Sequence, residues 1–107
     1  MSCKVHVLEF SRDDYRAIRT KVKSRFGAKV WAEVDADFKS ISSQIGQMPL
    51  SGLVPDEIRA IGLTECRQRL VGQTRVIYQI KGEQVYVHLF IDTSRNFSTM
   101  LHQRLLG

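Results

Sequence analysis

The 107-residue sequence lacks the features that define several special classes of protein. Its longest apolar runs are three residues, whereas a membrane-spanning helix needs about 20. The N-terminal stretch Met-Ser-Cys-Lys-Val-His contains no apolar segment of the kind found in signal peptides. We therefore expect a cytoplasmic protein that does not associate with membranes.

The sequence has only two cysteines, Cys3 and Cys66, with neither a Cys-x-x-Cys pair nor a Cys/His cluster. A structural zinc site needs such a cluster, so neither a metal nor another cofactor is expected. In a cytoplasmic protein both thiols are expected to stay free, with Cys66 as a small apolar residue in a strand. A catalytic Cys66 would need a neighbouring base, for which His88 is the available candidate.

Neither a disordered tail nor a fibrous protein fits the composition, which is 43% apolar and 25% charged. The length is enough for one domain that covers residues 1–107. The net charge of +5 is unevenly placed, with +4 over residues 1–34, −2 over residues 35–63 and +3 over residues 64–107. A small basic protein often binds nucleic acid or an acidic protein, and the alternative is a solvated basic surface without a ligand.

Apolar residues recur at helical spacing in the N-terminal half of the sequence. Residues 5–10 read as a strand, and Ser11 is a typical N-cap for a helix over residues 12–26. Gly27 is expected to end this helix, and a second helix then runs to Gly46. The apolar stripe of the second helix consists of Val30, Trp31, Val34, Phe38, Ile41 and Ile45. Two helices joined at a glycine predict an antiparallel helical hairpin.

The periodicity changes to two after residue 64. Strands are predicted over Cys66–Val71, Thr74–Ile80 and Gln84–Ile91, and the short turns between them indicate an antiparallel meander. The third strand is apolar almost throughout, which is typical of a central strand covered on both faces. A short C-terminal helix follows from Phe97.

The expected fold is α+β with the element order β-α-α-β-β-β-α. A loop with one helical turn near residues 56–61 separates the helices from the meander. The N-terminal strand is expected to join the meander in an antiparallel sheet, because a lone strand cannot satisfy its backbone hydrogen bonds. The helical hairpin would then cover one face of the sheet.

Two segments resemble the RelE/ParE superfamily of bacterial type II toxins. Residues 66–78, Cys-Arg-Gln-Arg-Leu-Val-Gly-Gln-Thr-Arg-Val-Ile-Tyr, match its two-strand pattern of Arg, then Val-Gly, then Arg-Val-hydrophobic-Tyr. Residues 87–97, Val-His-Leu-Phe-Ile-Asp-Thr-Ser-Arg-Asn-Phe, resemble its last strand and the turn into its C-terminal helix. The order of elements agrees over the whole chain.

The resemblance implies one of two activities. RelE-like toxins cut messenger RNA on the ribosome, whereas ParE-like toxins poison DNA gyrase and are not nucleases. Toxins of this superfamily arrest growth, contribute to plasmid stabilisation and are held inactive by a cognate antitoxin. The resemblance therefore implies a hetero-oligomer with an antitoxin.

The residues at the matching positions favour the gyrase inhibitor. Metal-free RNA cleavage needs a base, an acid and cations that stabilise the charged phosphorane. Arg75 and Arg95 match arginines of the superfamily, but Asp92 stands where a histidine is found and Phe97 where a hydroxyl is wanted. His102 is the remaining titratable candidate near the C-terminus. Because an aspartate can act as a base, a ribonuclease that uses Arg75, Arg95 and Asp92 stays as an alternative.

The same resemblance suggests two sets of binding residues. The candidates for target binding are Arg75, Arg95, Met100 and Arg104. The candidates for antitoxin binding are Trp31, Phe38, Arg67 and Arg69. Arg67 and Arg69 share one face of their strand, since side chains two residues apart point the same way.

Each of these residues also has a structural interpretation. The alternatives are core positions for Trp31 and Phe38, a solvated face for Arg67 and Arg69, and an ion pair from Arg75 to Glu65 or Glu83. His88 is expected to be a satisfied core histidine. Two further functions stay open, a non-toxic module that binds an antitoxin and a simple RNA-binding domain. For the latter, the three tyrosines at 15, 78 and 86 are too scattered to form a stacking platform.

Overall fold

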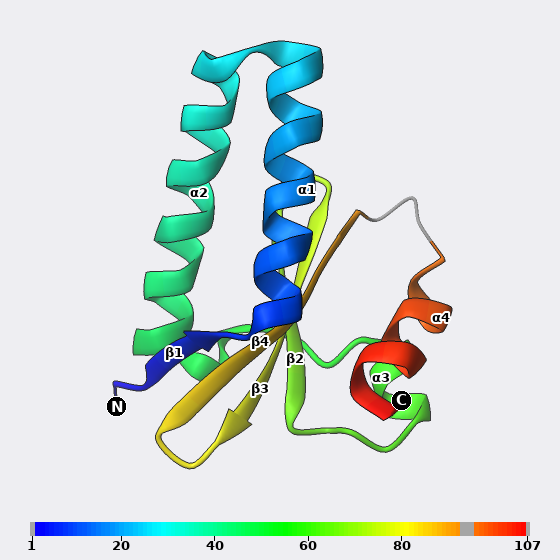
Figure 1. Ribbon diagram of the computed structural model, residues 1–107. Coiled ribbons are helices and arrows are strands. Elements are labelled where there is room, and N and C mark those ends of the chain that lie inside the picture. Colours follow the sequence, from blue (N-terminus) through cyan, green and yellow to red (C-terminus); the bar gives the residue numbers. More distant parts are fainter. Residues whose placement is uncertain (1, 93–95, 107) are drawn as a thin grey trace.

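The structure is a computed structural model that describes residues 2–92 and 96–106 (Figure 1). Its elements are β1 (Lys4–Val7), α1 (Glu9–Phe26), α2 (Ala28–Gln47), the 3-10 turn η1 (Pro49–Ser51), α3 (Asp56–Ala60), β2 (Cys66–Val71), β3 (Thr74–Lys81), β4 (Gln84–Asp92), α4 (Phe97–Leu101) and the π-helical turn η2 (His102–Leu106). The α+β class and the order β-α-α-β-β-β-α are confirmed, and the helical turn near residues 56–61 is α3.

The four strands form one sheet in the order β1-β4-β3-β2. Strands β2, β3 and β4 make the expected antiparallel meander, and β4 is a central strand as predicted. Strand β1 pairs with β4 in parallel, so the sheet is mixed and the expectation of a purely antiparallel sheet is wrong. The chain passes through two long helices after β1, and local sequence does not encode the direction in which so long a connection returns.

The first strand is shorter and the first helix begins earlier than predicted. Strand β1 ends at Val7, and α1 begins at Glu9 with Leu8 as its N-cap residue. Ser11 is therefore not the N-cap. It lies buried in the first turn of α1, where its hydroxyl donates to the carbonyl oxygen of Val87 at 2.7 Å and ties the helix to β4.

The corner between α1 and α2 is at Gly27, as predicted. Its φ of 91° lies in the left-handed half of φ/ψ space, which residues with a side chain rarely adopt. Its N–H donates to the carbonyl oxygen of Lys23 at 3.0 Å and so caps α1. Figure 1 shows the two helices rising from the sheet as an antiparallel pair.

A β-bulge at His88 reverses the side-chain direction along β4. Tyr78 of β3 lies opposite Val87, and the preceding Ile77 lies opposite Leu89, so His88 is an extra residue in the ladder. Val87 therefore packs under the helical hairpin, whereas Leu89 packs on the other face of the sheet. Strand β4 contributes Val85 and Val87 to the core of the hairpin face and Leu89 and Ile91 to the other core, and Phe90 packs against the core of the hairpin face.

The two faces of the sheet carry separate apolar cores. Helices α1 and α2 cover one face, called here the hairpin face, whose buried core residues are Phe38, Ile45, Val71, Val76, Tyr78, Val85 and Val87. Helices α3 and α4 cover part of the opposite face, called here the α4 face, whose buried core residues are Ile58, Cys66, Ile77, Leu89, Ile91, Phe97 and Leu101.

Candidate functional site

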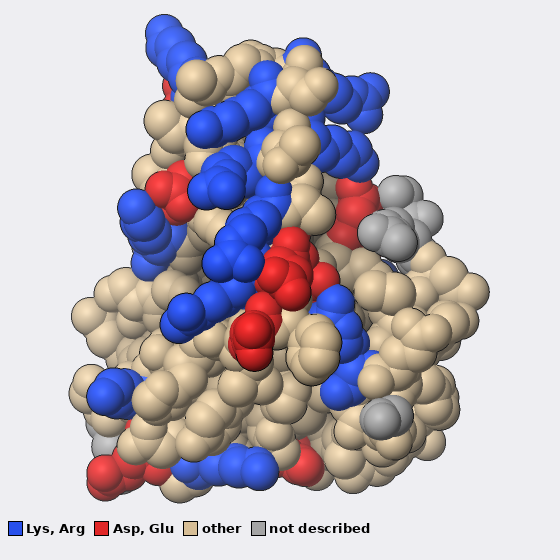
Figure 2. Space-filling model, viewed as in Figure 1, with Lys and Arg blue, Asp and Glu red and all other residues tan. Residues whose placement is uncertain are grey.

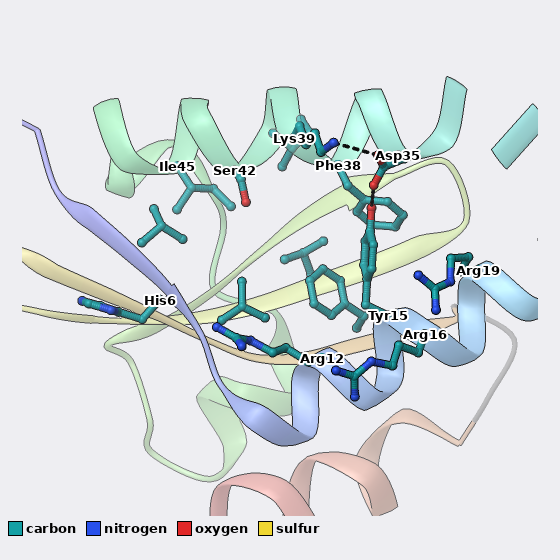
Figure 3. Close-up of a pocket in the computed structure, with 15 residues that line it drawn as sticks. His6, Arg12, Tyr15, Arg16, Arg19, Asp35, Phe38, Lys39, Ser42 and Ile45 are labelled. Atoms are coloured by element: carbon teal, nitrogen blue, oxygen red, sulfur yellow. Dashed lines mark hydrogen bonds and ion pairs between the residues drawn. The ribbon is translucent and has the colours of Figure 1, made fainter. Parts of the chain in front are cut away.

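A groove of about 650 Å³ lies on the hairpin face between α1 and α2 (Figure 3). Its rim is cationic, with Arg12, Arg16 and Arg19 on α1 and Lys39 opposite them on α2. Its floor is apolar and consists of Val5, Val7, Phe38, Ile41, Ile45, Val76 and Phe90. We call this the hairpin groove. An apolar floor between cationic walls suits an amphipathic segment whose polar side chains are acidic.

The three arginines of the rim form a row because they are four and three residues apart on a helix. Figure 2 shows the concentration of Lys and Arg side chains along the hairpin. Arg16 forms an ion pair with Asp13 at 2.9 Å, but both side chains are more than half exposed, so the pair is weak. Among the residues that line the groove, Asp35 is the single acid.

Asp35 is held by groups from both helices. The hydroxyl of Tyr15 on α1 donates to Asp35 Oδ1, and Lys39 Nζ lies 2.9 Å from Oδ2. The hydrogen bond from Tyr15 and then the one from Lys39 hold the pKa of Asp35 below its usual value. Burial, followed by Asp35, raises the pKa of Tyr15. The phenol therefore stays protonated and the carboxylate stays charged at neutral pH, which makes this bridge a structural link rather than an acid–base pair.

Trp31 and Phe38 are core residues in this chain. Their side chains are only 8% and 5% exposed. Tyr15 makes edge contacts with both rings, at centroid distances of 5.3 Å to Trp31 and 5.0 Å to Phe38. Phe38 belongs to the groove floor, whereas Trp31 does not line the groove. A partner in the groove can therefore reach Phe38 but not Trp31 without a change in the hairpin.

Arg67 and Arg69 point to the hairpin face at the β2 edge, and both bond within the chain. Arg67 Nη1 donates to the carbonyl oxygen of Gly52 at 2.8 Å. Arg69 donates to Ser51 Oγ at 2.8 Å and to Gln44 Oε1 at 2.9 Å. The two arginines share a face as predicted, and they tie the segment around η1 to β2 and α2. All the groups that accept these hydrogen bonds are neutral, so the contacts do not neutralise the positive charge of either arginine.

Arg75 lies on the α4 face, enclosed by α3 and α4. Its Nη1 is 3.5 Å from Glu57 Oε2, so its ion pair is with α3 rather than with Glu65 or Glu83. The guanidinium carbon lies 4.1 Å from the centre of the Phe97 ring, a cation–π contact. The side chain is only 21% exposed.

The structure does not bring Arg75 and Asp92 together. Asp92 follows the bulge in β4 and pairs with Lys21 of α1 at 3.6 Å, on the hairpin side of the sheet. Arg75 contacts α3 and α4 on the opposite side. Arg95, the third residue of the ribonuclease alternative and a candidate for target binding, lies outside the described residues.

Arg104 and Met100 serve the packing of the C-terminal segment. Arg104 forms an ion pair with Asp14 of α1 and donates to the carbonyl oxygen of His88 at 3.3 Å. Met100 is partly buried against the core of the α4 face. Both residues are predicted from the sequence to bind the target. In this chain a target could contact only the exposed part of Met100 and little of Arg104.

Cys66 and His88 do not form a nucleophile and its base. Burial raises the pKa of the Cys66 thiol to about 11, which disfavours the reactive thiolate. His88 is half-buried and its Nε2 bonds to Gln79 Oε1 at 2.8 Å, so the expectation of a satisfied histidine is confirmed. Both cysteines are free, as expected.

The residues of the groove rim are not among those predicted from the sequence to bind a partner. The spacing of Arg12, Arg16 and Arg19 on a predicted helix was a signal that could have found one wall. Lys39 and the floor residues could not be predicted in this way, since only the packing of α2 and the sheet places them opposite the arginines.

Within residues 2–92 and 96–106, no group of three or more His, Cys, Asp or Glu side chains is placed to hold a metal ion. Nor does any helix in the described part combine the length and apolarity that a membrane crossing needs.

Comparison with known proteins gives a match in structure alone. No family model and no curated protein sequence matches the chain. Among solved structures, a chain described as the chromosomal ParDE TA system from P. aeruginosa superposes with a TM-score of 0.70 and 10% identity, over 87% of this chain and 98% of that one. The two chains share one fold. The fold implied by the sequence resemblance is thereby confirmed, over nearly the whole length of the matched chain.

Proposed function

We propose that this chain is the toxin of a type II toxin–antitoxin system, that it inhibits DNA gyrase, and that an antitoxin keeps it inactive in a hetero-oligomer. The observation that carries the proposal is the hairpin groove, a cationic cleft with an apolar floor in a chain whose fold is that of a ParDE-system chain. Gyrase acts in the cytoplasm, so the protein would work there. Growth arrest, and stabilisation of a plasmid that carried the gene, would follow from the activity.

The hairpin groove supports an antitoxin of acidic, amphipathic character. Its apolar side chains would be buried on Phe38 and Phe90, and its carboxylates would lie beside Arg12 and Arg19. Opposite charges at the rim also raise the rate of encounter. In this arrangement Trp31 would support the groove wall from behind. Arg67 and Arg69 lie outside the groove and would offer a second, smaller cationic contact at the β2 edge.

The surroundings of Arg75 favour gyrase inhibition over RNA cleavage. A ribonuclease needs an arginine that can meet the scissile phosphate, with an acid and a base on either side. Arg75 instead has a carboxylate and a phenyl ring as neighbours, and its guanidinium is mostly buried. A phosphate would have to displace Glu57, and Phe97 cannot exchange a proton. Inhibition of gyrase needs only a complementary protein surface.

The first test uses purified protein, freed of antitoxin, with gyrase, ATP and relaxed plasmid. We expect loss of supercoiling, and linear DNA after denaturation that requires both gyrase and this protein. A parallel reaction in a cell-free translation extract measures cleavage of a reporter transcript. Transcript cleavage without any effect on gyrase would overturn the gyrase proposal and establish the ribonuclease. No effect in either reaction from folded protein would leave the non-toxic binding module as the conclusion.

The second test concerns the groove. The antitoxin is first identified as the protein that restores growth to cells expressing this chain. Reversing the rim with Arg12→Glu, Arg16→Glu and Arg19→Glu should slow its association about 10-fold or more at low salt. The matched control reverses three other cations of the hairpin, Lys23, Arg25 and Lys29, which do not line the groove. Equal slowing in the control would show that net charge, and not the groove, recruits the antitoxin.

A further inference from the structure

The α4 face of the sheet is covered over only part of its area. Helices α3 and α4 pack on Cys66, Ile77, Leu89 and Ile91. Toward the β3–β4 turn the same face carries polar side chains from three strands, and all of them are exposed or partly exposed. These residues, called here the open sheet face, are Lys4, His6, Gln79, Lys81, Gln84 and Tyr86. In Figure 1, α3 and α4 lie to the right, away from β1 and the β3–β4 turn.

The strand register arranges the open sheet face as two rows. Gln84 of β4 pairs with Lys4 on β1 and with Lys81 on β3. Tyr86 pairs in the same way with His6 and with Gln79. Neighbouring strands are about 4.8 Å apart and alternate residues about 7 Å apart, so the rows form a patch about 10 Å wide.

The inner row contains a stacked pair of rings. The rings of His6 and Tyr86 are 5.1 Å apart at an interplanar angle of 19°. His6 Nε2 bonds to Gln84 Oε1 at 2.5 Å, which holds the imidazole in place. The scattered positions of the tyrosines in the sequence predict no stacking platform. The stacked pair arises because parallel pairing of β1 and β4 sets a histidine beside a tyrosine, and each ring keeps one face that the other does not cover.

The outer row contributes positive charge. Lys4 and Lys81 flank Gln84, and both ammonium groups are on exposed side chains. Neither row contains an acid, and the acid next to the outer row is the exposed Glu83 of the β3–β4 turn. The nearby Glu65 of the preceding loop accepts a hydrogen bond from Gln79 Nε2 at 3.4 Å. A ring platform beside two lysines is the arrangement that proteins use for unpaired nucleotides, with bases stacked on rings and phosphates beside cations.

We propose that the open sheet face binds single-stranded DNA, with bases stacked on Tyr86 and His6 and the backbone beside Lys4 and Lys81. The strand must be single because a paired base cannot lay its face on a side chain. The polar side chains already bond one another, as in His6–Gln84 and His88–Gln79. Binding therefore depends on stacking and charge, neither of which needs the 2′-hydroxyl of RNA.

Fluorescence anisotropy with a labelled 12-nucleotide oligothymidylate tests the proposal on the full chain, without gyrase. The wild-type protein should bind it, and Tyr86→Ala should weaken binding about 10-fold or more, whereas Tyr86→Phe should bind nearly as well as wild type. Replacing both Lys4 and Lys81 by alanine should reduce the slope of log K against log salt by about 1.4. The matched control, Lys23→Ala with Lys29→Ala, should leave the slope unchanged.

The competing outcomes are distinct. The proposal would be overturned if folded Tyr86→Ala protein still bound the DNA as well as wild type. It would also be overturned if the control variant at Lys23 and Lys29 lowered the salt slope as much as the variant at Lys4 and Lys81. Either result would place the DNA on the basic hairpin. Equal affinity for a duplex of the same length would do so as well. Binding restricted to the RNA of matching sequence would contradict the choice of DNA. The result does not depend on whether the protein inhibits gyrase.

Discussion

The guanidinium of Arg104 and the carboxylate of Asp14 form a two-contact ion pair, with N···O distances of 2.8 and 2.5 Å, across 90 residues of sequence. The pair sits at the bulge in β4. Asp14 Oδ2 accepts from the N–H of Phe90, and Arg104 donates to the carbonyl oxygen of His88. Both backbone groups lie beyond Val87, where the pairing of β4 with β1 ends, so the pair gives them partners and fastens the C-terminal segment to α1.

Breaking this pair should destabilise the protein. Asp14→Asn and Arg104→Met should each lower the free energy of unfolding by roughly 1–3 kcal/mol, between the values for exposed and buried pairs, because both side chains are largely but not fully buried. The double variant should lose less than the sum of the two, since each single variant leaves one charge without its partner and the double variant leaves none. Urea unfolding of the four proteins measures the coupling. Strict additivity would show that the pair contributes nothing of its own.

The hydroxyl of Tyr78 holds the segment around η1 against the sheet. It donates to the carbonyl oxygen of Pro49 at 2.6 Å and accepts from the N–H of Gly52 at 3.1 Å. Tyr78→Phe should therefore lower the free energy of unfolding by about 1–3 kcal/mol, because two backbone groups lose their partner. Tyr86→Phe, at a partly exposed tyrosine, is the matched control and should change stability little. Equal stability of both variants would show that water replaces the hydroxyl.

The two thiols should differ in reactivity. Cys66 is buried, with a pKa raised to about 11, whereas Cys3 is partly exposed. With a thiol reagent at pH 8, one thiol per chain should react quickly and the second only at the rate of unfolding. A Cys3→Ala variant should lose the fast phase. Fast reaction of Cys66 in that variant would mean that the core of the α4 face opens readily.

His88 should make the stability depend on pH. Burial, and then the charge of Lys81, lower its pKa in the folded state. Below the ordinary histidine pKa of about 6.5 the unfolded chain takes up the proton more readily, so stability is complete above that pH and declines as the pH falls. The loss in unfolding free energy between pH 7.5 and 5.5 should be smaller in His88→Gln. If the variant lost as much unfolding free energy as the wild type, groups other than His88 would cause the pH dependence.

Much of the fold could be predicted because its elements have strong local signals. The stripe from Val30 to Ile45 defines α2, Gly27 marks the hairpin corner, and the change to period two at residue 64 defines the meander. The start of α1 differs from the prediction because Ser11, a good N-cap in isolation, is instead buried within the helix. There its hydroxyl donates to the carbonyl oxygen of Val87. Tertiary contact outweighed a capping preference worth about 1 kcal/mol.

The sequence by itself determined the α+β class, the element order, the central place of β4 and the pairing of β2, β3 and β4, because helical and strand periodicity are local properties. Only the tertiary structure decided the parallel course of β1, the bulge at His88 and the partners of the arginines. Those features depend on contacts between residues far apart in the chain. For the same reason, only folding assembles the hairpin groove from two helices and the sheet, and sets His6 beside Tyr86 on the open sheet face.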